Sequence, residues 1–326
     1  MTRQTLLALL TAGEIVACFG AGTYAQTVSF APVGSIMGPA EVVRTQGSFA
    51  YIAGGKTLTI VDISHPEEPK RVGAYTFPRA IWGFTVVDAK VYVAADVFGL
   101  AILDVSNVAV PTLLGSIKTP GQAKNVALFG TRALVADHVA GIDVIDVSTP
   151  TTPALLRSFF VEGFAKDVIA LGSVAYAIDM PNGFYVFDLS KPDVSDPVST
   201  LTLASAATQL AQLEVSDTSS IPARRLAVVV GGGGPLQVYD VSDMSAPVHA
   251  TTYRVPGGAG AVALKGSLAY TAGSEGLQVV DLGTPSQPTI LGAYQTAKRA
   301  RYVAVTGSLV LVVIANNEVL ILRQSP

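Results

Sequence analysis

The 326-residue sequence is poor in the residues that build metal centres and disulfide frameworks, with one cysteine and three histidines. A cysteine-rich zinc site and a disulfide scaffold are therefore excluded. Charged residues make up only 14% of the chain, and 21 basic against 24 acidic residues leave a net charge of −3. Because no basic field is available to hold a phosphate backbone, we expect no nucleic-acid partner. Half of the residues are hydrophobic, which excludes a disordered chain.

Residues 1–25 are expected to form a signal peptide, and residues 26–326 a single domain. An apolar stretch opens at residues 6–10, and the small residues of Thr23-Tyr24-Ala25 suit a signal peptidase. We expect export to the periplasm, the extracellular space or the cell surface, with cleavage after Ala25. Lipid anchoring at Cys18 is the alternative, because Ile15-Val16-Ala17 before it resembles a lipobox, although Glu14 interrupts the apolar run. No later stretch reaches the ~18 apolar residues of a membrane span.

One phrase of the type Ile-Val-Asp-Ile-Ser recurs through the rest of the chain. Its copies lie 41 or 42 residues apart, except for one interval of 52, and are centred on Asp62, Asp104, Asp146, Asp188, Asp240, Asp281 and, in place of Asp, Arg323. Each unit holds four short segments rich in Val, Ile and Leu and separated by Gly, Pro and Asp, which is typical of strands. Four strands in about 42 residues indicate a propeller blade. The sequence therefore predicts an all-β, seven-bladed β-propeller.

The third unit gives the strand bounds, named A to D in chain order: residues 123–129, 133–136, 141–147 and 154–159. The chain stops after strand C of the seventh unit. Residues 32–36 parallel strand D residues 113–117, so an N-terminal strand should complete the last blade and close the ring. Closure leaves no open seam between blades. Deleting residues 28–37 is expected to unfold or oligomerise the protein.

The phrase Leu-x-Ile-x-Asp-Val-Ser-x-Pro-x-x-Pro, preceded by Ala-Tyr-Val-Ala, resembles the LVIVD repeat family. The resemblance covers essentially residues 28–323. It implies a propeller fold and a bacterial or archaeal surface or exported protein, and it says almost nothing about activity.

The recurrent residues have a structural explanation. An Asp at the end of strand C, just before a turn, can accept backbone N–H groups in an Asx-type turn, and six copies around a ring indicate fold more than a carboxylate ring. A recurrent glycine in the A–B turn is expected where positive φ is needed, at Gly47, Gly130, Gly172, Gly266 and Gly307. The fifth unit carries a surplus at residues 216–222, placed between strands A and B, and a four-glycine run at residues 231–234, interpreted as a flexible turn.

In propellers, ligands usually bind at the face formed by the D–A and B–C loops. The candidate ligand-binding residues there are Arg79, Trp82, Asp96, Lys124, Asp137, Lys166 and Arg301. Cations, carboxylates and the sole tryptophan together suit an anionic or sugar-like ligand. The alternative is that these are solvated loop charges that pair across blades.

Catalytic candidates are few. His138 with Asp137 and Asp179 is the best acid–base group, because histidine titrates near neutrality. Calcium held by oxygen ligands from Asp96, Asp137 and Asp179 is considered, but no cofactor or metal site is assigned. We therefore expect a monomeric binding module for a protein, a small molecule or a glycan. The alternatives are a propeller hydrolase or lactonase with a channel-face site, and a structural surface protein without a discrete ligand.

Overall fold

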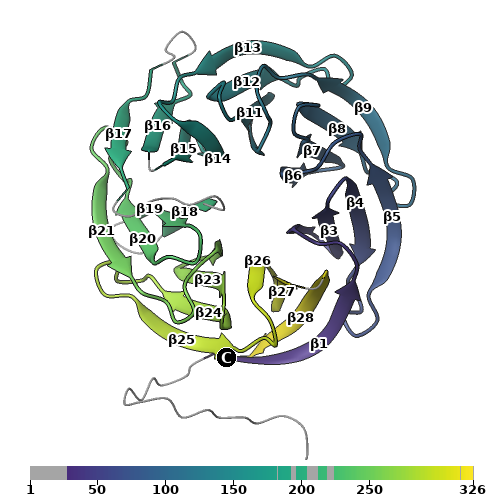
Figure 1. Cartoon of the computed structure of the whole chain (residues 1–326), viewed down its shortest axis with the longest axis vertical. Coiled ribbons are helices and arrows are strands. Elements are labelled where there is room, and N and C mark those ends of the chain that lie inside the picture. Colours follow the sequence, from purple (N-terminus) through teal and green to yellow (C-terminus); the bar gives the residue numbers. More distant parts are fainter. Residues whose placement is uncertain are drawn as a thin grey trace, which may run out of the picture.

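A computed structural model describes residues 28–181, 183–191, 196–203, 212–218, 224–315 and 317–325. Its strands form seven four-stranded antiparallel sheets arranged around a central axis, as Figure 1 shows. The described residues contain no helix. They consequently include no helix that is long and apolar enough to cross a membrane. The predicted seven-bladed β-propeller is confirmed.

Each of the first six blades follows the chain from its innermost strand A to its outermost strand D. Blades 1 to 3 consist of β2 (Val42–Gln46), β3 (Phe49–Gly54), β4 (Thr57–Asp62) and β5 (Lys70–Thr76); β6 (Gly83–Val87), β7 (Lys90–Ala94), β8 (Leu100–Asp104) and β9 (Thr112–Ile117); and β10 (Asn125–Phe129), β11 (Arg132–Ala136), β12 (Ile142–Asp146) and β13 (Ala154–Phe159). The four strands predicted for the third unit agree with the last set within two residues.

Blades 4 to 6 repeat this order. They consist of β14 (Phe164–Leu171), β15 (Val174–Met180), β16 (Gly183–Asp188) and β17 (Ser199–Thr202); β18 (Gln212–Thr218), β19 (Arg224–Val230), β20 (Leu236–Asp240) and β21 (Val248–Tyr253); and β22 (Ala261–Lys265), β23 (Leu268–Gly273), β24 (Gly276–Asp281) and β25 (Thr289–Tyr294). Of the surplus expected at residues 216–222, the first three lie at the end of β18 and the rest lie outside the described residues.

The seventh blade joins the two ends of the described chain. It consists of β26 (Ala300–Thr306), β27 (Leu309–Ile314), β28 (Glu318–Ser325) and, as its outer strand, β1 (Ser29–Met37). β1 pairs antiparallel with β28 from Ser29 opposite Ser325 to Met37 opposite Glu318. Its bulge between Pro32 and Gly34 matches the one that precedes Gly115 in β9. The expected closure and the expected alignment of residues 32–36 with 113–117 are both confirmed.

The hydrophobic core is divided into layers between neighbouring blades. Strands B and C are buried on both faces and therefore read as continuous apolar runs, whereas outer strands such as β13 are mostly exposed. Ile60 of blade 1, for example, packs in one cluster with Phe84 and Leu103 of blade 2. Since each sheet buries its faces only against the next sheet, the fold requires the complete ring.

The recurrent aspartates and glycines act as the sequence predicts. Each of the six Asp side chains accepts the backbone N–H two residues later, at N···O distances of 2.8–3.0 Å. The five A–B turn glycines have φ between 55° and 59°. Blade 2 places Asp88 at this turn with φ of 52°. These residues thus define turn geometry at the face opposite the predicted ligand face.

Candidate functional site

The face built from the D–A loops and B–C turns, called here the upper face, gathers polar and aromatic side chains over blades 2 to 4. Trp82, Lys124 and Lys166 lie at matching positions near the start of strand A in these three blades, just before β6, just before β10 and within β14. Asp96 and His138 occupy the matching position of the B–C turns in blades 2 and 3, with φ of 51° and 53°. The repeat therefore brings these five residues to neighbouring places.

Lys124 is the centre of this group. Its Nζ lies 4.2 Å from the ring centroid of Trp82 and 3.9 Å from Oδ1 of Asp96. The Lys124 side chain is only 10% exposed, whereas Trp82 is 50% exposed. Burial lowers the pKa of Lys124, and the positive charge of Lys166 lowers it further, while Asp96 opposes both effects. The ammonium group is thus held against an exposed ring with one carboxylate as counter-charge.

The B–C turns connect each blade to the next. The Asp96 carbonyl accepts the Ala123 N–H at 3.1 Å, and the His138 carbonyl accepts the Ala165 N–H at 2.9 Å. The second bond places the His138 ring on Phe164, with centroids 4.6 Å apart and planes 13° apart. Burial, followed by the nearby lysine charges, lowers the pKa of His138, so the imidazole is neutral at neutral pH.

Lys166 completes what we call the upper-face cluster: Trp82, Asp96, Lys124, His138, Phe164 and Lys166. Burial lowers the pKa of Lys166 as well. Within the described residues its ammonium group has no ion pair. A partly buried cation without a counter-charge is destabilising unless an anion arrives from outside.

Two buried carboxyl groups lie beneath the cluster in blade 3. Asp137 accepts hydrogen bonds from Thr119 Oγ1 at 2.7 Å and from the Gly121 N–H at 2.5 Å. Asp143 accepts one from Ser158 Oγ at 2.5 Å, and its Oδ2 is buried with no donor facing it. Burial and the negative charge of Asp137 raise the pKa of Asp143 to about 7. Burial raises the pKa of Asp137 as well, so the two carboxyl groups titrate together and we expect the pair to retain a proton up to near neutral pH.

Asp179 has a corresponding place in blade 4. It accepts the N–H groups of Gly163 and Gly183, each at 2.6 Å, and the hydroxyl of Tyr185 at 2.7 Å. Burial and the bond to Asp179 raise the pKa of Tyr185 to about 12. Among the described residues, the His138 imidazole is hydrogen-bonded to neither Asp137 nor Asp179. The hydrolase alternative stays a prediction.

The remaining predicted residues lie apart from the cluster. Arg79 is exposed in the loop before β6, and Arg301 is exposed in β26 of blade 7. Neither has a contact with the cluster in the described part of the chain. No group of three or more His, Cys, Asp or Glu that could hold a metal occurs in the ranges described, and calcium binding stays a prediction.

Phe164, Asp143 and Thr119 also belong to this region and were not predicted from the sequence. Phe164 is the first residue of β14, two residues before Lys166. This closeness in sequence to Lys166 is the only feature of the sequence that points to Phe164. Asp143 interrupts an apolar strand in which the other blades have Thr, Ala, Tyr, Gln or Leu. A buried polar residue in strand C was therefore visible, but its partner was not.

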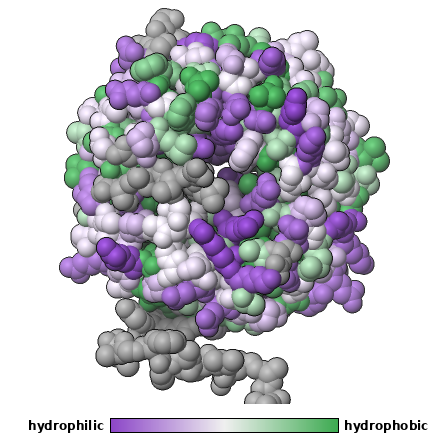
Figure 2. Space-filling model, viewed as in Figure 1, coloured by the Kyte–Doolittle hydropathy of each residue, from purple (hydrophilic) through white to green (hydrophobic). Residues whose placement is uncertain are grey.

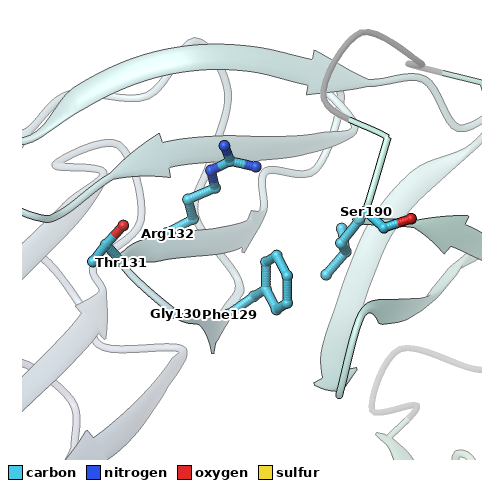
Figure 3. Close-up of a pocket in the computed structure, with 6 residues that line it drawn as sticks. Phe129, Gly130, Thr131, Arg132 and Ser190 are labelled. Carbon is cyan, nitrogen blue, oxygen red and sulfur yellow. The ribbon is translucent and has the colours of Figure 1, made fainter.

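Two cavities lie outside the cluster. One, of about 320 Å³, lies among the inner strands β2, β6, β10 and β14 and includes Arg44, Thr85 and Asn125. The other, of about 340 Å³, lies at the opposite face, where Figure 3 shows Phe129 between Arg132 and Ser190 of the next blade. In Figure 2 one face of the ring is hollowed at its centre, and hydrophilic side chains border the hollow.

The ring of seven four-stranded sheets defines a β-propeller, and the sequence family agrees with it. The model of the LVIVD repeat matches residues 37–76, 90–119, 120–160 and 256–296, which are blades 1, 2, 3 and 6. Four stretches of the chain thus match the LVIVD repeat, as the resemblance of its Asp-centred phrase indicated. A comparison with curated proteins finds no matching sequence.

Solved structures show the same fold at low identity. A chain of the mitotic checkpoint complex is 11% identical, with a TM-score of 0.73 and coverage of 95% of this chain and 99% of that one. The WD40 domain of Pan2 from Neurospora crassa is 15% identical, with a TM-score of 0.71 and coverage of 90% and 95%. At these identities the likeness concerns the architecture alone.

Proposed function

We propose that this chain is an exported binding module whose ligand is held at the upper-face cluster by an anionic group. The observation that carries the proposal is the pair Lys124 and Lys166, two partly buried cations. Within the described residues only Lys124 has a carboxylate partner, Asp96, and the exposed rings of Trp82 and Phe164 lie beside the pair. An incoming anion would relieve their repulsion, and the rings offer flat apolar surface beside it. The leader pattern of residues 1–25 supports export.

Trp82 is the only tryptophan of the chain, so its fluorescence reports on this site alone. We expect glucuronate, citrate or inorganic phosphate, titrated into the full chain, to change Trp82 emission and raise the melting midpoint. A ligand at a hundredfold excess over its Kd stabilises the folded state by about 2.7 kcal/mol. The double variant Lys124→Ala, Lys166→Ala should lose both signals, while Lys70→Ala, an exposed lysine on β5, should keep them.

Anion binding that survives the double lysine variant would contradict the proposed site. Export is tested separately by mass spectrometry of the chain recovered outside the cytoplasm, which should begin at Gln26. An intact leader on that material would contradict the proposed cleavage.

A further inference from the structure

The upper face over blades 2 to 4 exposes more apolar surface than the cluster alone explains. Val139 is 66% exposed and Phe160 69%, and Val97, Trp82 and Phe164 are also exposed. Val97 and Val139 occupy the same position of two successive B–C turns, directly after the positive-φ residues Asp96 and His138. Contiguous exposed apolar side chains of this kind mark interaction sites.

These side chains belong to one continuous surface. Gly141 of the blade 3 turn packs on the carbonyl of Phe159, which brings the turn carrying Val139 beside the segment carrying Phe160. His138, next to Val139, stacks on Phe164. On the other side, the Asp96 carbonyl bonds to Ala123, which joins the turn carrying Val97 to the residue before Lys124.

Among the described residues, the unpaired charge at the centre of this surface is positive, and the unpaired negative charge of Glu162 lies at its rim. Lys124 and Lys166 lie within it, and the imidazole of His138 is neutral. Asp96 is already paired with Lys124, and Asp137 is fully buried. Glu162 lies at the rim, where its backbone N–H donates to the hydroxyl of buried Tyr185. A partner that fits must therefore present apolar side chains together with at least one carboxylate.

We infer that the ligand of this face is a segment of a protein partner that combines acidic and apolar side chains; the inference rests on the proposed function. A sugar acid would use the two lysines and the two cluster rings but would leave the aliphatic Val97 and Val139 uncovered. Protein interfaces, in contrast, bury aromatic and aliphatic anchors and use complementary charge to fix register.

The test is selection of random displayed peptides on the immobilised full chain, followed by titration of the enriched synthetic peptides with Trp82 emission as the signal. We expect enriched sequences that carry Asp or Glu beside Leu, Ile or Phe. Lys166→Glu and Phe160→Ser should each weaken binding by about tenfold or more. The matched controls Lys70→Ala and Val248→Ser, at exposed positions on the outer strands β5 and β21, should leave the affinity unchanged.

The remaining outcomes separate this inference from the proposed function. Enriched peptides without acidic residues, or affinities that Lys166→Glu leaves unchanged, would overturn the acidic partner. Failure of peptide selection, together with binding of oligogalacturonate that the double lysine variant abolishes, would overturn the protein partner and uphold the anion site. If neither peptides nor simple anions bind, both the inference and the proposed function fail. All variants are compared after a cooperative melting transition has shown that they fold, because Phe160, Lys70 and Val248 are exposed but Lys124 and Lys166 are partly buried.

Discussion

One pair of buried positions in the repeat carries different residue types in different blades. In blade 2, Ala95 at the end of strand B lies near Ala101 in strand C, and both are fully buried. Blade 3 replaces this pair with Asp137 and Asp143, and blade 4 with Asp179 and Tyr185. The polar pairs bind the D–A loops through Thr119, Gly121 and Gly163. They therefore fix the two loops that lead into Lys124 and Phe164.

The carboxyl pair of blade 3 should make stability depend on pH. The pKa of Asp143 is raised to about 7 in the folded protein, against about 3.9 in an unfolded chain. The folded state thus binds the extra proton between these values, and its stability falls as pH rises from about 4 to about 7. Asp143→Asn keeps a donor toward Asp137 and should flatten this slope, with a gain of about 2–4 kcal/mol at pH 8.

Urea unfolding at several pH values measures this effect. Asp143→Ala, which copies Ala101 of blade 2, is the matched variant: it should also flatten the slope but gain less, because it offers no hydrogen bond to Asp137. An Asp143→Asn protein whose stability keeps the parental slope between pH 4 and pH 7 would show that the proton is not shared by this pair.

The part of the site that the sequence predicts is the part that the repeat controls. Trp82, Lys124 and Lys166 could be placed together because strand A has the same register in every blade. The stacking of His138 on Phe164 could not, because it depends on the positive φ of His138 and its bond to the next blade. Arg301 has the right register too, but blade 7 places it elsewhere on the ring. The register of the repeat predicts where a residue lies within its blade. Contacts between blades determine which of these residues come together in the site.

At the scale of the strand, a recurrent glycine in strand D allows neighbouring blades to touch. Gly73 of β5 faces the carbonyl of Val108 in the C–D turn of blade 2, and Gly115 of β9 faces that of Pro150 in blade 3. Gly34 of β1 faces Pro66 in the same way. Each glycine sits beside the bulge of its outer strand. A side chain at these positions would meet backbone, which has little freedom to move.

Gly73→Ala is therefore expected to destabilise the protein. The added methyl group would clash with the Val108 carbonyl, and overpacking against backbone costs about 1–3 kcal/mol, more than the alanine gains in backbone entropy. Thr251 holds the equivalent position of β21 in blade 5 and already carries a side chain. Thr251→Ala should change the free energy of unfolding by about 0.5 kcal/mol or less. Equal effects of the two substitutions in chemical denaturation would contradict the close approach.

At the scale of the whole molecule, the repeat phase made the closure of the ring predictable. Each unit has four segments, and the last unit lacks its fourth, so the N-terminal strand could be assigned to the outer position of that blade. In the structure β1 occupies this position and has the same bulge as β9. Val28, just before β1, also faces Gly292 of blade 6, as Val108 faces Gly73. The covalent order of blade 7 is thus interrupted, but its contacts follow the pattern of the other blades.

Circular permutation can make blade 7 continuous in sequence and place the chain ends between blades 7 and 1. A chain that begins at Gly38 and runs to residue 323, with Arg323→Asp, would continue through a copy of residues 105–111 into Ala31–Met37. The copied turn spans the gap because Arg323 and Ala31 are paired as Asp104 and Thr112 are. The copied turn also supplies a counterpart of Val108 for the contact with Gly292. The permutant loses the exposed ion pair of Arg323 with Glu67, which contributes little to the free energy of unfolding.

We expect this permutant to fold as a monomer with a melting midpoint close to that of the parent, because every strand keeps its partner. Deleting residues 28–37 without replacement should unfold or oligomerise the chain, because β28 loses its outer neighbour and buried Ile36 is removed from the core between blades 7 and 1. Calorimetry and size-exclusion chromatography compare the three proteins. A permutant that fails to fold, beside a deletion variant that stays monomeric with the parental midpoint, would refute closure by this strand.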